Sequence, residues 1–134
     1  MNTNEYLNST TKLFERHYGN DLNVFDTDCL KGIERVIIGD DCFVKVNRFV
    51  IDGLNELKSV IIGDGSFSLD DNNRIGSKCL IMNCDQLSDI HCGCFSFMYY
   101  ESFECKNLRS LISIQLDSYA FCKCHSIVLE SMND

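Results

Sequence analysis

The sequence predicts a mainly-β solenoid of about four coils of 24 residues, with two parallel sheets. An eleven-residue pattern, clearest at residues 57–67, occurs four times along the chain. In each copy a turn residue follows the first apolar residue by six positions, and a phenylalanine follows the turn residue by four. Short alternations of apolar and polar residues, typical of half-buried strands, recur with the same spacing. Repetition of this kind indicates one structural unit stacked on itself.

The starts of the four copies are separated by 24, 30 and 24 residues. We divide the solenoid, residues 22–134, into units near 30–53, 54–83, 84–107 and 108–131. Because equivalent residues stack coil upon coil, the phenylalanines are expected to form an internal aromatic row, each contributing roughly 1.5–3 kcal/mol through burial. The copies begin at Ile33, Leu57, Leu87 and Leu111, have the turn residues Gly39, Gly63, Gly93 and Asp117, and end at Phe43, Phe67, Phe97 and Phe121.

Each unit carries two strand-like segments whose alternate apolar residues are expected to point inward. In the first segment these are Val36 and Ile38, Val60 and Ile62, Ile90 and Cys92, and Ile114 and Leu116. In the second they are Phe49 and Ile51, Cys79 and Ile81, Phe103 and Cys105, and Ile127 and Leu129. Residues suited to a positive φ follow, namely Gly53, Asn83, Asn107 and Ser131. A further inward column is expected from Leu30, Leu54, Cys84, Leu108 and Met132.

Residues 1–21 do not carry the repeat, and two interpretations are open. The apolar and aromatic residues of segment 13–18 are spaced as on a short amphipathic cap helix, which Gly19 would end. Alternatively, the segment is a degenerate earlier repeat in which Phe14 takes the place of the later phenylalanines. We prefer the cap helix. From Leu22 the pattern enters half-way through a unit, because residues 25–30 align with residues 49–54.

Two further features of the array concern its surface and its end. The second unit is six residues longer than its neighbours, and the surplus around residues 70–73 is polar, which predicts a protruding loop. This loop lacks the alternation of ligands of an EF-hand calcium site. The sequence stops just after Met132, where a fifth unit would begin. We expect the last coil to present an unpaired strand edge and an apolar interior. The array then either continues in a longer protein or meets a partner here, including a second copy end to end.

The composition argues against several classes of function. A net charge of −8, from 12 basic and 20 acidic residues, argues against binding to nucleic acids or anionic membranes. No apolar run approaches the roughly 18 residues of a membrane span. Nine cysteines, an odd number, together with an N-terminus unlike a secretory signal, favour free thiols in the cytoplasm. A cell-surface or secreted location is the alternative if the chain is a fragment.

Residues 54–67 read Leu-x-x-Leu-x-x-Val-x-Ile-Gly-x-x-Ser-Phe. This motif resembles the leucine-rich repeats of the BspA type, in which a Leu-x-x-Leu-x-x-Ile-x-Ile segment is followed by a Gly-x-x-Ala/Ser-Phe turn. The resemblance covers residues 22–132. It implies a curved leucine-rich-repeat solenoid that binds other proteins, often at microbial or protist cell surfaces, with no catalytic residues to carry over. The chain departs from the motif at Asp117, in the cysteines that fill apolar columns, and in the lack of proline after the strands.

The cysteines are interpreted mainly as apolar filler, because free cysteine behaves as a small hydrophobic residue. Two groups, His-Cys-Gly-Cys at 91–94 and Cys-Lys-Cys-His at 122–125, contain zinc-ligand residue types. However, His91 and Cys92 are expected to face opposite ways, and Cys-x-Cys lacks the usual ligand spacing. We therefore predict no metal, no cofactor and no catalytic residue. In an oxidising setting, a disulfide between Cys94 and Cys124 or between Cys122 and Cys124 is the alternative. The filler positions are Cys79, Cys84, Cys92 and Cys105.

The outward rows of the two strand segments are the best candidates for a binding surface. Contiguous exposed apolar side chains usually mark an interaction site, although β-branched residues also suit strands for structural reasons alone. Tyr99 and Tyr100, at a turn, add aromatic side chains of a kind enriched at interfaces. The first row consists of Ile37, Ile61, His91 and Gln115, and the second of Val50, Leu80, Glu104 and Val128.

The predicted function is that of a non-catalytic protein-interaction module with an unidentified protein partner. Two alternatives are open. The chain is a fragment of a larger adhesin-like array at a cell surface, or it is a small zinc or redox protein that uses the Cys/His groups.

Overall fold

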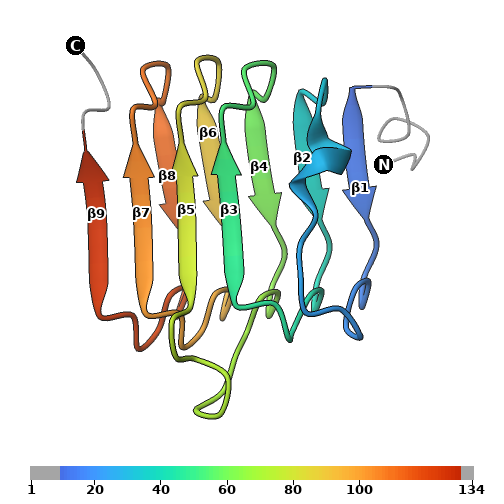
Figure 1. The fold of residues 1–134 in the computed structure, drawn as a ribbon, viewed down its shortest axis with the longest axis vertical. Coiled ribbons are helices and arrows are strands. Elements are labelled where there is room, and N and C mark those ends of the chain that lie inside the picture. The colour runs from blue at the N-terminus through green and yellow to red at the C-terminus, as the bar shows by residue number, and fades with distance from the viewer. Residues whose placement is uncertain (1–9, 131–134) are drawn as a thin grey trace.

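The computed structural model describes residues 10–130, which form a β-solenoid of about five turns. Two parallel sheets face each other across one core, and their strands run in opposite directions (Figure 1). The five-stranded sheet consists of β1 (Thr11–Phe14), β2 (Arg35–Ile38), β4 (Ser59–Ile62), β6 (Asp89–Cys92) and β8 (Ser113–Leu116). The four-stranded sheet consists of β3 (Arg48–Asp52), β5 (Lys78–Met82), β7 (Ser102–Lys106) and β9 (Ser126–Glu130).

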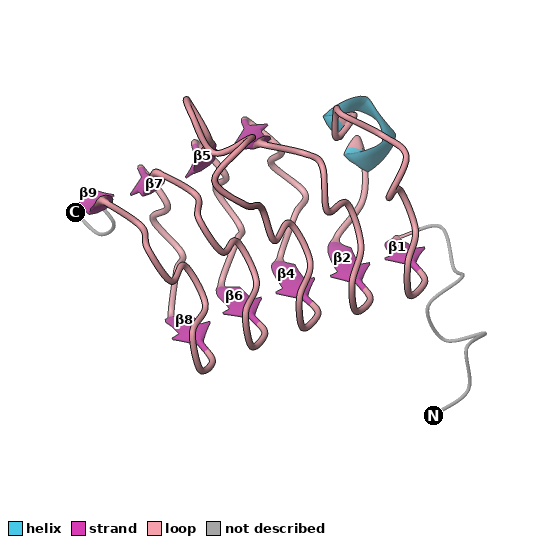
Figure 2. Cartoon of the chain, turned by 90° about the horizontal axis from the view of Figure 1, so that it is seen from below, coloured by secondary structure: helices cyan, strands magenta, loops and turns pink. Residues whose placement is uncertain are grey.

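Equivalent residues of successive coils pair with each other throughout both sheets. Val36 pairs with Val60, which pairs with Ile90 across the longer second unit. In the other sheet Phe49 pairs with Cys79, and Cys79 with Phe103. The prediction that the repeat units stack as parallel coils is therefore confirmed. Figure 2, a view along the strands, shows the coils following one another in a single row.

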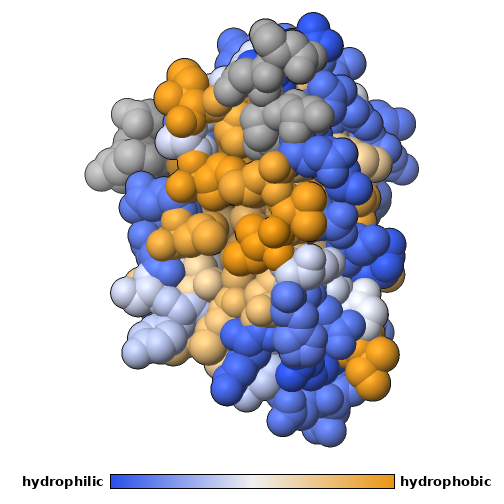
Figure 3. All heavy atoms as spheres, turned by 90° about the vertical axis from the view of Figure 1, so that its left-hand side faces the viewer, coloured by the Kyte–Doolittle hydropathy of each residue, from blue (hydrophilic) through white to orange (hydrophobic). Residues whose placement is uncertain are grey.

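The core is built from the alternate residues that the sequence predicts to point inward. In β2, β3, β4, β5, β6 and β7 both inward residues are at most 2% exposed, whereas the residues between them are half-buried or exposed. Inward residues of the last coil are more open, and Ile127 and Leu129 in β9 are each 54% exposed. Seen from this end, an apolar area occupies the middle of the surface (Figure 3). Ser131 and Met132, to which the sequence assigns a turn and a core position, lie outside the described residues.

The predicted aromatic row is present. The rings of Phe43, Phe67, Phe97 and Phe121 stack in turn, with centroids 5.3, 4.9 and 4.8 Å apart and planes within 15° of parallel. All four residues have φ between 53° and 57°, in the left-handed region that non-glycine residues seldom adopt. Packing between the rings therefore holds the turn in a conformation that the backbone alone disfavours.

The turn glycines allow the coils to approach closely. Gly39, Gly63 and Gly93 do not have a positive φ, so their backbone conformation alone does not require glycine. A Cβ atom on Gly63, however, would lie 2.5 Å from the carbonyl carbon and oxygen of Gly39 in the preceding coil. Only a residue without a side chain fits where two backbones pass at this distance.

The predicted N-terminal cap helix is wrong for the described residues. Residues 11–14 form β1, which pairs in parallel with β2, so this segment is a degenerate earlier coil. Phe14 pairs with Ile38 and does not stand at the aromatic turn position. Gly19 stands there instead, because a side chain on it would collide with the ring of Phe43. Tertiary pairing with β2 thus overrides the local helical spacing.

Residues 25–30 follow the predicted alignment with residues 49–54 in which side chains are buried, but they do not adopt the strand conformation of β3. Phe25 and Leu30 are buried as expected. Thr27–Leu30 nevertheless forms a 3-10 helix, η2, in place of a strand. The carboxylate of Asp26 accepts a hydrogen bond of 2.9 Å from the backbone N–H of Asp28, a contact that favours a helical turn over an extended chain. β3 is therefore the edge of its sheet.

The extra residues of the second unit form a loop that projects from the solenoid, seen at the bottom of Figure 1. This confirms the predicted protrusion.

None of the described helices could cross a membrane.

Replacement of Phe67 by alanine tests the aromatic row. The substitution Phe67→Ala should lower the free energy of unfolding by about 3–5 kcal/mol, because it opens a cavity between two stacked rings. Phe95→Ala is the matched control, since Phe95 also has a positive φ but is 47% exposed. Urea unfolding followed by circular dichroism measures the free energy of unfolding of both variants. Equal losses in the two variants would contradict the stabilising role of the aromatic row.

Replacement of Gly63 by alanine tests the close approach of the coils. We expect Gly63→Ala to lower the melting temperature more than Gly32→Ala does. A Cβ on Gly32 has no atom within 4 Å, and its cost comes from φ alone. The reverse order would show that the coils can move apart without penalty.

Candidate functional site

The first predicted row lies in one line across the five-stranded sheet. Ile37, Ile61, His91 and Gln115 pair in this order, and Leu13 of β1 extends the line by one residue. All five side chains are half-buried or exposed, and Ile61 is 37% exposed. Leu13, Ile37 and Ile61 are thus three neighbouring apolar side chains on an outward sheet face.

The other half of this row is polar and is tied to Asp117. Nε2 of His91 donates to Oδ2 of Asp117 at 2.8 Å, and Nε2 of Gln115 donates to Oδ1 at 3.0 Å. The hydrogen bond from His91 and then that from Gln115 hold the pKa of Asp117 below its ordinary value. The row is therefore apolar over β1, β2 and β4 and hydrogen-bonded over β6 and β8.

The second predicted row also lies in register, but charge interrupts it. Val50, Leu80, Glu104 and Val128 pair in this order and are all half-buried. Glu104 accepts ion pairs from Lys78 at 3.9 Å and Lys106 at 3.3 Å. Glu104 thus separates Val128 from the two neighbouring apolar residues of this row, Val50 and Leu80.

The two tyrosines are not equivalent. Tyr100 is fully buried, so its prediction as an accessible aromatic residue is wrong. Its hydroxyl donates to the carbonyl oxygen of Val46 at 2.5 Å, which satisfies the phenol inside the core. Tyr99 is half-buried, and its ring lies 5.5 Å from the guanidinium of Arg74.

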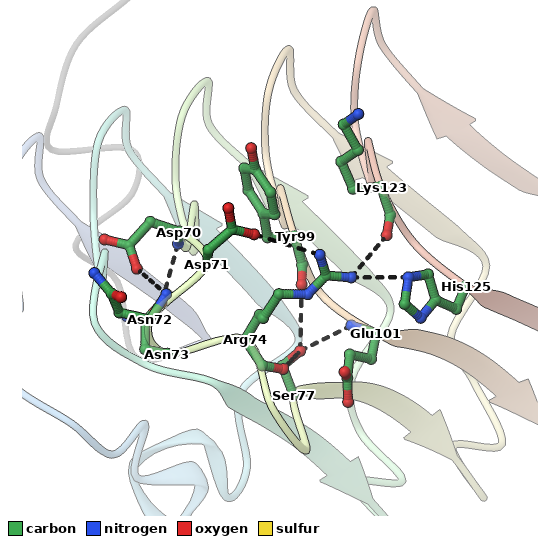
Figure 4. A network of polar contacts seen from close by, with 10 residues as sticks. All are labelled: Asp70, Asp71, Asn72, Asn73, Arg74, Ser77, Tyr99, Glu101, Lys123 and His125. Atoms are coloured by element: carbon green, nitrogen blue, oxygen red, sulfur yellow. Dashed lines mark hydrogen bonds and ion pairs between the residues drawn. The ribbon is translucent and has the colours of Figure 1, made fainter.

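Arg74 fastens the protruding loop to the next two coils (Figure 4). Its Nη2 donates to Nε2 of His125 at 2.9 Å and to the carbonyl of Lys123 at 3.5 Å. Its Nη1 lies 3.6 Å from the carboxylate of Asp71. Since arginine only donates hydrogen bonds, Nε2 of His125 is the acceptor in this contact. Arg74 is not predicted from the sequence, where its only signal is its position after a polar run.

The side chains around the loop turn bond to their own backbone. Oδ1 of Asp70 accepts from the N–H of Asn72, and Oδ1 of Asn73 accepts from the N–H of Asp70. These are local turn contacts, of the kind that asparagine and aspartate commonly make.

The four cysteines predicted as filler are buried. Burial raises the pKa of Cys105 to about 12 and raises that of Cys79 well above its usual value. All nine cysteines are free thiols. A buried, protonated thiol is a poor nucleophile, so these four positions serve the core.

The described residues contain a cluster of metal-ligand types that differs from the one the sequence indicates. The ligand atoms of Asp64, Cys94 and Asp117 lie within 4.8 Å of one another. Oδ1 of Asp64 accepts from the backbone N–H of Cys94, and Asp117 is occupied by its two donors. Of the two predicted Cys/His groups, only Cys94 belongs to this cluster.

Two hollows adjoin near Asn47, the residue before β3. One, of about 410 Å³, is lined on one side by residues 23–27 and on the other by β3. The other, of about 670 Å³, extends from Lys45 to the protruding loop. Asn23 and Asn47 line both. Neither hollow is predicted from the sequence, because they arise where η2 replaces a strand and where the loop projects.

Comparison of the chain with family models, with curated proteins and with solved structures finds no match.

Thiol modification tests the role of the cysteines as core residues. At about pH 8, where ordinary thiols ionise appreciably, exposed Cys29 should react in the folded protein. The five buried thiols should react only after unfolding, because they are inaccessible; they are Cys42, Cys79, Cys84, Cys92 and Cys105. Mass spectrometry of alkylated peptides separates the two classes. Modification of Cys79 as fast as Cys29 would contradict the assignment.

Proposed function

We propose that this chain is a non-catalytic protein-interaction module built on a leucine-rich-repeat solenoid of the BspA type. The observation that carries the proposal is the line of apolar side chains formed by Leu13, Ile37 and Ile61 on three adjacent strands. Apolar side chains that neighbour one another on an outward face favour contact with a partner over contact with water.

The absence of helical cover supports this reading. In many proteins with parallel sheets, helices cover both sheet faces. Here the described residues contain one short 3-10 helix, and it lies at the end of the row of coils (Figure 2). No helix within residues 10–130 therefore covers the outward face of either sheet.

A reducing location, which we propose to be the cytoplasm, agrees with the nine free thiols. The alternative proposal, a fragment of a larger cell-surface array, is favoured by the open last coil. Leu116, Ile127 and Leu129 occupy inward positions there and yet are 40–54% exposed, as they would be if another coil or a second copy normally covered them.

A photo-crosslinking experiment tests the proposed surface. A benzophenone amino acid at position 61 should give one dominant protein adduct in cells that produce the chain. The double variant Leu13→Lys/Ile37→Lys, made in the chain that carries the probe at position 61, should lose capture of the same partner by about tenfold or more, because charges replace the neighbouring apolar contacts. Ile75→Lys is the matched control, since Ile75 is 82% exposed on the protruding loop, outside the row.

Three outcomes separate the hypotheses. Loss of capture in the double variant alone supports binding through the row. Equal capture by all variants contradicts it. An adduct between two copies of this chain, with an increase in sedimentation coefficient, would instead assign the surface to self-association.

A further inference from the structure

The free edge of β3 differs from the other sheet edges because the structure describes all the residues of the coil that lies beside it. β1, β8 and β9 belong to the first and last described coils, so the residues beside their outer edges are not fully described. β3 instead faces residues 22–30 of the first coil, all of which are described. Those residues form an irregular segment followed by η2, and β3 pairs with β5 alone.

The backbone of β3 presents unpaired groups toward this space. Lys78 donates its N–H to the carbonyl of Asn47, and Gly53 donates to the carbonyl of Met82. In a parallel ladder, alternate residues bond to the same neighbour. With the observed register, Phe49 and Ile51 therefore bond toward β5. The N–H and C=O groups of Arg48, Val50 and Asp52 point the other way, and no hydrogen bond within residues 10–130 engages them.

A hollow lies directly in front of these groups. Its volume is about 410 Å³, within the roughly 300–1,000 Å³ typical of ligand sites. Phe25, only 7% exposed, contributes an apolar wall, and the 72% exposed Val24 lies on the same side. The opposite side is β3 itself, with the backbone groups described above. Figure 2 shows η2 beyond β3, at the end of the row that the strands of this sheet form.

We propose that the edge of β3 binds an extended polypeptide segment of a partner, which adds to the four-stranded sheet as a fifth, parallel strand. An exposed strand edge recognises peptides through main-chain hydrogen bonds, while alternate side chains give specificity. We assign the parallel direction because every pair in this sheet is parallel and the hollow occupies the place of the strand that the first coil lacks.

The side chains of the edge define the peptide. Arg48 is exposed and makes no ion pair within the described residues, Val50 is half-buried, and Asp52 is exposed. A parallel segment would place an acidic residue beside Arg48, an apolar residue between Val50 and Val24, and a basic residue beside Asp52. The preferred ligand therefore reads acidic-x-apolar-x-basic. This site is separate from the row of Ile37 and Ile61, so each can fail without the other.

Fluorescence polarisation with a labelled peptide tests the proposal. The probe is Thr-Glu-Thr-Val-Thr-Lys-Thr, and the comparison peptide has Glu and Lys exchanged. We expect saturable binding of the first peptide and at least tenfold weaker binding of the second. Absence of saturable binding up to about 1 mM, a range that includes very weak peptide sites, would overturn the proposal.

Two variants locate the bound peptide. Val50→Pro removes one edge N–H without removing a ladder bond to β5, because the N–H of Val50 points away from β5. It should weaken binding about tenfold, whereas Val50→Thr, which keeps the N–H, should not. Arg48→Glu should abolish the preference between the two peptides, because each peptide then makes one attractive and one repulsive charge contact with Glu at position 48 and Asp52. This exposed substitution also guards against a folding defect in the proline variant.

The outcomes also separate other occupants of the edge. Unchanged binding in both Val50→Pro and Arg48→Glu places the peptide elsewhere and overturns the assignment. A concentration-dependent dimer that Val50→Pro dissociates would assign the edge to a second copy of the chain instead. Neither result depends on capture of a partner through Ile61, so the proposed function is judged independently.

Discussion

The constraint on which the structure depends is that each residue lies directly over its equivalent in the next coil. Adjacent parallel strands are about 4.8 Å apart, so each side chain must pack against the side chain at the equivalent position of the next coil. Flat rings stack well at this separation, as Phe67 and Phe97 do with planes 2° apart. Glycine is needed where two backbones nearly touch, as at Gly39 and Gly63.

Polar residues at equivalent positions stack in the same way and form hydrogen bonds from one coil to the next. Nδ2 of Asn107 donates to Oδ1 of Asn83, and Nδ2 of Asn83 donates to Asp52, each at 2.9 Å. Inside, the hydroxyl of Ser66 donates to the carbonyl of Gly39 and accepts from the N–H of Cys42. These bonds satisfy the turns between the strands and fix the register of one coil on the next.

Surface features arise where the stacking departs from regularity. Replacement of a strand by η2 leaves β3 as an edge and opens a hollow beside it. Extra residues in the second unit form a loop that Arg74 fastens across the following coils. The outward rows are regular in backbone position but vary in side-chain type from coil to coil. One row, for example, changes from the apolar Ile61 to His91, which is hydrogen-bonded to Asp117.

The sequence by itself determined the period, the parallel stacking and the inward residues, including the aromatic row and the filler cysteines. These follow from alternation and spacing, which a local pattern records completely. The tertiary structure alone decided that residues 11–14 pair as a strand, that residues 27–30 form a helix, and that Tyr100 is buried while Tyr99 meets Arg74. Each of these depends on partners distant in the chain, such as Val46 for Tyr100, and short-range periodicity carries no information about such contacts.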